Sequence, residues 1–279
     1  MDTSPDGRID VEMDVIRRVD RLIAQCPSER HELVEDYGAD PSKVVIVPSG
    51  VNVDRFRPVD RNQARGRLGI KPDTFVIAYV GRMLPRKDVR NVVRAAALLI
   101  EQVEHPVQLL LVGGDTDDPD PELTPEIGEL QSLAGELGIL EHLIFTGRRQ
   151  PDDLRNYYGA GDVAVTTPWY EPYGLTPLEA MACGVPVIGS AVGGITFTVK
   201  DGETGFLVPP RDPAALARKL RYLLERPEER RRMGHAARRR VEREFTWPVV
   251  AQRTAALYRD QLRPWGSLKQ VDPVAVQTP

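Results

Sequence analysis

Short runs of aliphatic residues alternate along the chain with longer stretches in which apolar residues recur every three or four positions. The short runs are rich in Val, Ile and Leu, lack polar alternation, and predict strands that are buried on both faces. These predicted strands cover residues 44–47, 75–80, 107–112, 143–146, 163–167, 185–188 and 205–208. The longer stretches predict amphipathic helices. They cover residues 9–23, 28–37, 88–103, 125–137, 151–158, 175–183, 213–224, 227–244 and 247–262.

The alternation of strands and helices is regular from residue 75 onward and predicts an α/β fold. Right-handed crossovers place successive helices against a parallel sheet, so we expect a doubly wound domain. Before it, a polar and Arg-rich stretch at 54–71 favours a linker. The segment 264–279 has three prolines and few apolar residues, and we expect it to be a disordered tail.

The composition narrows the classes of partner and compartment. Lys plus Arg is 37 and Asp plus Glu is 41, so the net charge of −4 gives no reason to expect nucleic acid. No run approaches the roughly 18 apolar residues of a membrane span. The acidic, polar start is not a secretory signal. Two cysteines, Cys26 and Cys183, are too few for a disulfide scaffold or a Cys-based zinc site, so a reducing cytoplasm is the expected compartment.

The loops that follow the strands carry the candidate chemistry, because ligands of open parallel sheets bind at the carboxyl ends of the strands. Gly81, Arg82 and Lys87 follow the strand at 75–80. The glycine lets the backbone approach a ligand closely, and the two cations suit the binding of a diphosphate. A solvated basic loop is an equally weighted alternative. Asp115 and Asp117 follow the next strand and invite a metal site, but their acidic, Pro-rich surroundings favour a simple exposed loop.

The segment 168–186 has the highest density of candidate residues. Gly174, Leu175 and Thr176 open a helix, and their backbone N–H groups together with the helix dipole predict an anion site. Glu179 lies about one turn further along and could accept hydrogen bonds from a ribose diol. Glu171 precedes the helix and would face the cleft. The alternatives are an ordinary first-turn acid for Glu179 and a loop acid for Glu171, which the neighbouring Gly and Pro make less favourable.

These residues carry a resemblance to a known family. The segment from Glu171 to Glu179, with seven residues between the two glutamates, resembles the nucleotide-sugar signature of retaining glycosyltransferases of family 4. Further segments resemble other family motifs in the same order. They are residues 47–52 with Phe56, residues 80–82 with Lys87, residues 146–148 and residues 201–208. The resemblance extends over about residues 8–262.

The resemblance implies a GT-B fold, in which two Rossmann-like domains face each other across a cleft. The carboxyl-terminal domain would hold the donor and the amino-terminal domain the acceptor. In this frame, residues 1–50 are a remnant of the acceptor domain and 51–72 the linker. The donor domain would cover 73–245, and a helix at 246–263 would cross back toward the remnant. We expect that most of the acceptor domain is missing, because one helix–strand–helix–strand set at 8–47 precedes the linker.

The same resemblance implies a set of site residues. Arg82 and Lys87 would neutralise the departing diphosphate without a metal, and Glu171 would contact the donor sugar; these three are the expected catalytic residues. The expected substrate-binding residues are Gly81, Arg148, Tyr173, Gly174, Leu175, Thr176 and Glu179. Asp88 stands where the family usually has glycine, and Trp169 replaces a common small polar residue.

The resemblance implies transfer of a hexose, with retention, from a nucleotide sugar of the UDP-glucose or GDP-mannose type to an unidentified acceptor. No cofactor or metal is expected. A non-catalytic nucleotide-sugar-binding module, or one subunit of a split enzyme whose partner chain supplies the acceptor domain, is the main alternative, and an epimerase is a third. The Arg-rich helix at 226–244 leaves open a peripheral contact with anionic lipid.

Overall fold

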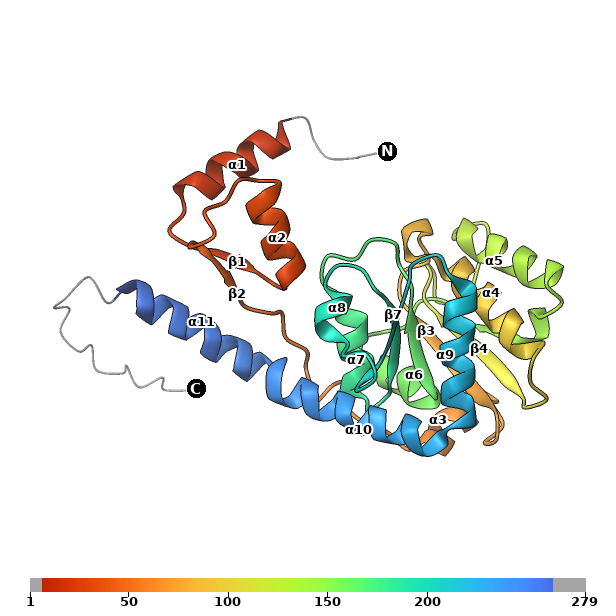
Figure 1. The fold of residues 1–279 in the computed structure, drawn as a ribbon. Coiled ribbons are helices and arrows are strands. Elements are labelled where there is room, and N and C mark those ends of the chain that lie inside the picture. The colour runs from red at the N-terminus through yellow and green to blue at the C-terminus, as the bar shows by residue number, and fades with distance from the viewer. Residues whose placement is uncertain (1–6, 263–279) are drawn as a thin grey trace, which may run out of the picture.

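The computed structural model describes residues 7–262, which form a large α/β domain preceded by a small α/β unit (Figure 1). The large domain contains a parallel six-stranded sheet in the order β5-β4-β3-β6-β7-β8. The strands are β3 Phe75–Val80, β4 Val107–Val112, β5 Leu143–Phe145, β6 Val163–Thr166, β7 Val187–Ser190 and β8 Gly205–Val208. The predicted doubly wound parallel sheet is therefore confirmed.

Helices cover both faces of this sheet. They are α3 Arg61–Arg67, α4 Val89–Ile100, α5 Pro125–Glu136, α6 Leu154–Ala160, α7 Leu175–Ala182, α8 Ile195–Thr198, α9 Pro213–Glu225 and α10 Pro227–Glu244, with two short 3₁₀ turns, η1 Pro85–Lys87 and η2 Leu140–His142. Ile77 and Leu109 face the core under α4, α5 and α9, whereas Val76 and Leu110 face a second core under α3, α6 and α7. Side chains on both faces of a strand are thus buried, which explains the absence of polar alternation.

The small unit is a helix–strand–helix–strand set. Its elements are α1 Arg8–Arg18, β1 Leu22–Ala24, α2 Pro27–Glu35 and β2 Val44–Ile46. The two strands form a parallel pair in the register Leu22↔Val44, and a minor core includes Ile16 and Ala24. The predicted helix at 9–23 is wrong at its end, because α1 stops at Arg18 and Ile23 belongs to β1. Pairing with β2 outweighs the helical spacing that Ile23 continues.

The connection between the two units passes beside the end of α10. The Val51 N–H donates to the Phe245 carbonyl at 2.8 Å, and Val51 also pairs with Thr246. From there α11, Trp247–Leu262, extends back toward the small unit (Figure 1). A side chain at Gly50 would come within 2.8 Å of the Trp247 ring, so the two passages of the chain are closely packed.

The stretch 51–72, expected to be a linker, contains α3, a helix that the composition did not predict. The Asp60 carboxylate caps α3 by accepting from the Gln63 N–H at 2.8 Å. Phe56 and Ala64 are buried in the second core of the large domain. From Phe56 onward this stretch is therefore an integral part of that domain. The tail expected at 264–279 lies outside the described residues.

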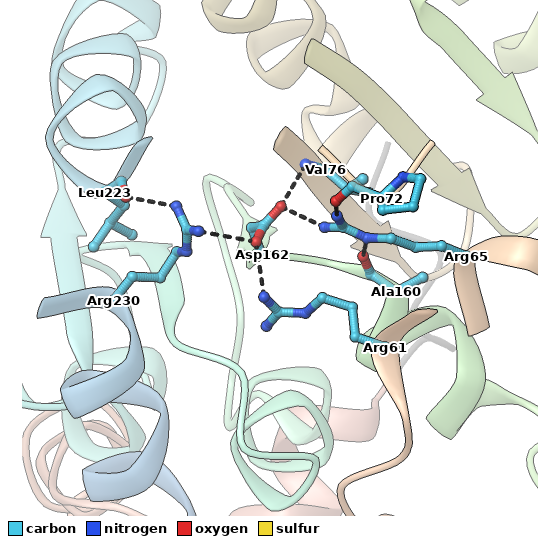
Figure 2. Close-up of polar contacts among 8 residues, drawn as sticks. All are labelled: Arg61, Arg65, Pro72, Val76, Ala160, Asp162, Leu223 and Arg230. Carbon is cyan, nitrogen blue, oxygen red and sulfur yellow. Dashed lines mark hydrogen bonds and ion pairs between the residues drawn. The ribbon is translucent and has the colours of Figure 1, made fainter. Parts of the chain in front are cut away.

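A buried carboxylate joins α3, α10 and the two central strands. Asp162, whose side chain is 4% exposed, precedes β6; its carboxylate accepts three hydrogen bonds and forms a further ion pair (Figure 2). Its Oδ2 accepts from Arg65 at 2.6 Å and from the Val76 N–H at 2.9 Å. Its Oδ1 accepts from Arg61 at 3.1 Å and lies 3.2 Å from Arg230. Each oxygen of Asp162 thus has two polar partners, three of them hydrogen-bond donors and the fourth the charge of Arg230.

Replacing this carboxylate tests how much the fold depends on it. We expect Asp162→Asn to lower the free energy of unfolding by about 3–5 kcal/mol, because Arg65, which is 3% exposed, would become a buried charge without its counter-ion. Asp152→Asn is the matched control, since Asp152 forms an exposed ion pair with Arg55 that contributes about 1 kcal/mol or less. Urea unfolding measures both, and equal small losses would contradict the expectation.

Candidate functional site

A cavity of about 1080 Å³ lies at the carboxyl ends of the central strands β3 and β6. The strand order reverses at this pair, because β4 and β5 lie to one side of β3 while β7 and β8 lie beyond β6. Such a reversal leaves a crevice at the carboxyl edge of a doubly wound sheet. The walls come from the loops after β3 and β6 and the start of α7, and Arg8 and Gln25 of the small unit complete them.

Eight of the ten predicted site residues line this cavity. They are Gly81, Arg82, Lys87, Glu171, Tyr173, Gly174, Leu175 and Thr176. They come from two loops that are separated by more than eighty residues in the sequence. The expectation that loops at the carboxyl ends of neighbouring parallel strands lie close together therefore agrees with the structure. Glu179 and Arg148 are not part of the lining, and Arg86 is a further basic residue of the lining that the sequence analysis did not single out.

An ion pair links the two loops across the cavity. The Lys87 ammonium at the end of η1 donates to Oε2 of Glu171, and both side chains are only 14% exposed. The sequence motifs predicted separate roles for the two residues and gave no indication of this pairing. An ammonium group has three N–H donors, so Lys87 keeps donors for an anion in the cavity while Glu171 holds it in place.

Arg82 is the less constrained of the two predicted cations. Its side chain is exposed at the edge of the cavity, and within residues 7–262 its guanidinium makes no hydrogen bond or ion pair. Its backbone carbonyl accepts from the Tyr79 hydroxyl at 3.0 Å, which fixes the course of the loop after β3. Arg82 can therefore turn toward a ligand without breaking an existing contact.

Asp88 takes up the backbone conformation that explains the family's usual glycine. Its φ of 50° and ψ of 47° are left-handed, and α4 begins at the next residue. Aspartate tolerates this region better than most residues, so the path of the chain is kept without glycine. Compared with glycine, the aspartate side chain has an electrostatic cost at this position. Burial raises the pKa of the Asp88 carboxyl, and its Oδ2 has no hydrogen-bond partner in the described part of the chain.

The amino end of α7 faces the cavity. Gly174 precedes α7 with a φ of 91°, a left-handed conformation that favours glycine, and Leu175 and Thr176 form the first turn. The first N–H groups of a helix lack intrahelical partners, so they and the helix dipole attract an anion at this point. The predicted anion site thus has the geometry that it requires.

Gly193 and Gly194, which follow β7, pack against the loop that carries Glu171. A side chain at Gly193 would come within 1.9 Å of the Glu171 carbonyl, and the Gly194 N–H donates to that carbonyl at 3.2 Å. Close backbone packing explains why these positions need residues without a Cβ. The pair therefore fixes the loop that carries Glu171.

Two predicted residues contribute in ways that the sequence did not indicate. The buried hydroxyl of Tyr173 donates to the Ser49 carbonyl at 2.8 Å, so its side chain ties the cavity wall to the connecting segment, and burial raises its pKa. Arg148 lies on an exposed loop, where its Nε is 3.3 Å from the Asp117 carboxylate. Asp117 is one of the two aspartates considered as metal ligands, and in the structure its carboxylate pairs with Arg148. Residues 7–262 hold no cluster of three potential metal ligands.

Glu179 is held by a tyrosine from the neighbouring helix. Its Oε2 accepts from the hydroxyl of Tyr158 in α6 at 2.8 Å, and the Tyr158 ring is fully buried against Phe56. Burial raises the pKa of Glu179, whereas the hydrogen bond from Tyr158 acts in the opposite direction. Tyr158 is a positioning residue that no sequence motif identified.

The Arg-rich helix for which the sequence left open a contact with anionic lipid is α10. Four arginines pair with glutamates three or four positions away, namely Arg231 with Glu228, Arg232 with Glu229, Arg238 with Glu242 and Arg240 with Glu244. Such pairs reduce the net positive charge available to an anionic surface. No helix in residues 7–262 has the length and apolar character needed to cross a bilayer.

Removing the Tyr158 hydroxyl tests the hydrogen bond to Glu179. We expect Tyr158→Phe to raise the pKa of Glu179 above its wild-type value, because the ionised carboxylate loses a donor while its burial is unchanged. The ionised form would then destabilise the folded state at neutral pH, and this cost would disappear as the pH falls below the carboxyl's unfolded pKa. Carboxyl ¹³C NMR titration measures the shift. Tyr157→Phe in the same helix is the control, and an unchanged Glu179 pKa would contradict the expectation.

Comparison with known proteins gives the family. Residues 60–240 match the family model of glycosyl transferases group 1, and residues 6–55 match that of glycosyltransferase family 4. A D-inositol 3-phosphate glycosyltransferase of Streptomyces bingchenggensis is 37% identical over 96% of this chain and 58% of its own length. That of Streptomyces scabiei is 39% identical over 91% of this chain and 57% of its own length. The chain therefore spans less than two thirds of these curated relatives.

Solved structures agree with this result. A sucrose-phosphate synthase from Thermosynechococcus elongatus matches with a TM-score of 0.81 and 35% identity, over 94% of this chain and 63% of its own. Anabaena HepE, solved with UDP and glucose, matches with a TM-score of 0.80 over 92% of this chain and 68% of its own, and at 22% identity it shows the fold alone. With more than half of its residues matched by the first family model, the chain belongs to the group 1 glycosyltransferases, and the predicted GT-B, family 4 relationship is confirmed.

Proposed function

We propose that the cavity binds the diphosphate and sugar of a nucleotide sugar, and that the whole protein transfers the hexose with retention to an acceptor hydroxyl. The observation that carries the proposal is the convergence of Lys87, Arg82 and the amino end of α7 on one cavity. Two side-chain cations and a helix dipole facing one space match the charge of a diphosphate. No metal is needed for this neutralisation.

The same arrangement suits the chemistry of the transfer. Negative charge grows on the leaving diphosphate as the bond to the sugar breaks, and donors that are already oriented stabilise it without reorganisation. The ion pair with Glu171 holds the Lys87 ammonium in place before the donor arrives. Glu171 also borders the cavity, where it can accept a hydrogen bond from a sugar hydroxyl. Lys87 and Arg82 would thus stabilise the leaving group, and Glu171 would orient both the lysine and the sugar.

We assign the ribose hydroxyls to Glu179. One of its oxygens accepts from Tyr158, and the other has no hydrogen-bond partner among residues 7–262. A carboxylate that is oriented on one side and open on the other is suited to accept from a diol. Its place outside the cavity lining means that the nucleoside would extend beyond the diphosphate subsite, past the start of α7.

The acceptor is proposed at the class level. The curated relatives are named for D-inositol 3-phosphate and the solved relative for sucrose phosphate, so a polyol or sugar phosphate is our candidate class. A second candidate function is a donor-binding subunit whose partner chain supplies the acceptor side. The apolar surface of α1 favours it, since Ile9, Val11 and Val15 are each at least half exposed.

Binding and turnover measured together separate the two functions. We expect UDP-glucose or GDP-mannose to bind by calorimetry, and the sugar to be transferred when D-inositol 3-phosphate or a hexose phosphate is added. Transfer supports the enzyme, whereas binding without transfer or sugar release supports the donor-binding subunit. Lack of binding by both nucleotide sugars would refute the two functions together.

Charge removal tests the diphosphate site. We expect Arg82→Gln and Lys87→Gln each to raise the Kd for the preferred nucleoside diphosphate about 10-fold or more, equivalent to about 1.4 kcal/mol. Arg82 is the cleaner test, because its guanidinium has no partner in the described structure, whereas Lys87→Gln also leaves Glu171 unpaired. Arg57→Gln is the control, since Arg57 is exposed outside the cavity lining. Unchanged affinity in both variants would refute the site assignment.

A further inference from the structure

A second cavity, of about 400 Å³, lies at the opposite edge of the same sheet. Its walls include Phe75 at the start of β3 and Asp162 just before β6, whereas the donor cavity is at the ends of these strands. The six residues of β3 separate the two cavities by roughly 20 Å. The second cavity is therefore a separate feature that the proposed transfer does not use.

The charge in this cavity is unbalanced. Arg61, Arg65 and Arg230 line it together with Asp162 and the exposed Asp73. Three guanidinium groups against two carboxylates leave a net positive charge, and the carboxylate of Asp162 already accepts three hydrogen bonds and lies within ion-pair distance of Arg230. Burial lowers the pKa of Arg230, the neighbouring Asp162 opposes this effect, and Arg61 and Arg65 lower the pKa further. An additional anion would remove this excess of positive charge.

The arginines differ in the donors that they keep available. Arg65 uses all three nitrogens, on Asp162 and on the carbonyls of Pro72 and Ala160 (Figure 2). Arg61 uses one nitrogen on Asp162, so its Nε and second terminal nitrogen have no partner within residues 7–262. Its side chain is 40% exposed, so an anion from solvent can reach it. The Nε of Arg230 is buried and also lacks a partner in the described structure.

We propose that this cavity is a binding site for a phosphate group, held by Arg61 on the solvent side and by the charge of Arg230 on the inner side. Guanidinium groups suit phosphate oxygens because their planar N–H donors match the geometry of the oxyanion. The volume accommodates inorganic phosphate or a small phosphate monoester, and Phe75, Leu224 and Pro227 contribute an apolar part of the wall. A bound phosphate would strengthen the link between α3 and α10.

Thermal unfolding with inorganic phosphate tests the site. We expect about 10 mM phosphate to raise the Tm by about 2–4 °C over sodium chloride of equal ionic strength, because a ligand that binds only the folded state stabilises it. Glycerol 3-phosphate is the second probe. Equal shifts show that the phosphate group alone is recognised, and a larger shift with the monoester shows that the rest of the cavity contributes; both support the proposal.

Variants separate this site from the donor cavity. We expect the Arg61→Gln variant to show no increase in Tm with phosphate. The Tm is compared with that of the same variant without phosphate, so that any change in basal stability cancels. Arg67→Gln is the matched control on α3, because Arg67 is exposed and lies outside the cavity lining. Lys87→Gln should retain the shift even if it weakens nucleotide binding. A shift that survives Arg61→Gln but is lost in Lys87→Gln, or the absence of any shift in the wild type, would overturn the proposal.

Discussion

The structure depends on how β3 and β6 are held together where the order of the sheet reverses. Their direct register comprises only Ile77↔Val163 and Ala78↔Ala164. Asp162 extends this short ladder, because its N–H donates to the Val76 carbonyl at 2.8 Å while its carboxylate accepts from the Val76 N–H. The same carboxylate holds α3 and α10. One residue therefore reinforces the pairing of the two strands whose opposite ends carry the loops of the candidate site.

The fold was predictable where burial alone determines the local structure. The strands β3, β4 and β8 have the predicted bounds, because predominantly apolar runs are buried on both faces. The elements that were missed or misplaced depend on distant contacts. Ile23 fits the helical spacing of α1 but lies in β1, where it pairs with Val45 of β2. The helix α3 is held by Asp162, which is about a hundred residues further along the chain. The local hydrophobic pattern contains no information about such distant partners.

The candidate site was predictable at the level of loops and less so at the level of side chains. The strand-end rule and the glutamate spacing identified the cavity lining. They did not reveal that Lys87 and Glu171 pair with each other, that Tyr173 binds the Ser49 carbonyl, or that Glu179 depends on Tyr158. Each of these contacts joins residues from different elements, so it follows from the tertiary packing. For Arg148 the motif predicted a substrate-binding residue, whereas its side chain pairs with Asp117 on an exposed loop.

The contact between Val51 and Phe245 has a mechanical consequence. The chain passes between the small unit and the large domain twice, and both passages are bonded to each other at this point. The small unit also contacts the large domain elsewhere, because the Cys26 thiol donates to the Pro172 carbonyl at 3.4 Å, in the loop that carries Glu171. Arg8 and Gln25 of the small unit border the same cavity as Lys87. A displacement of the small unit would therefore alter the cavity wall and the Glu171 loop together.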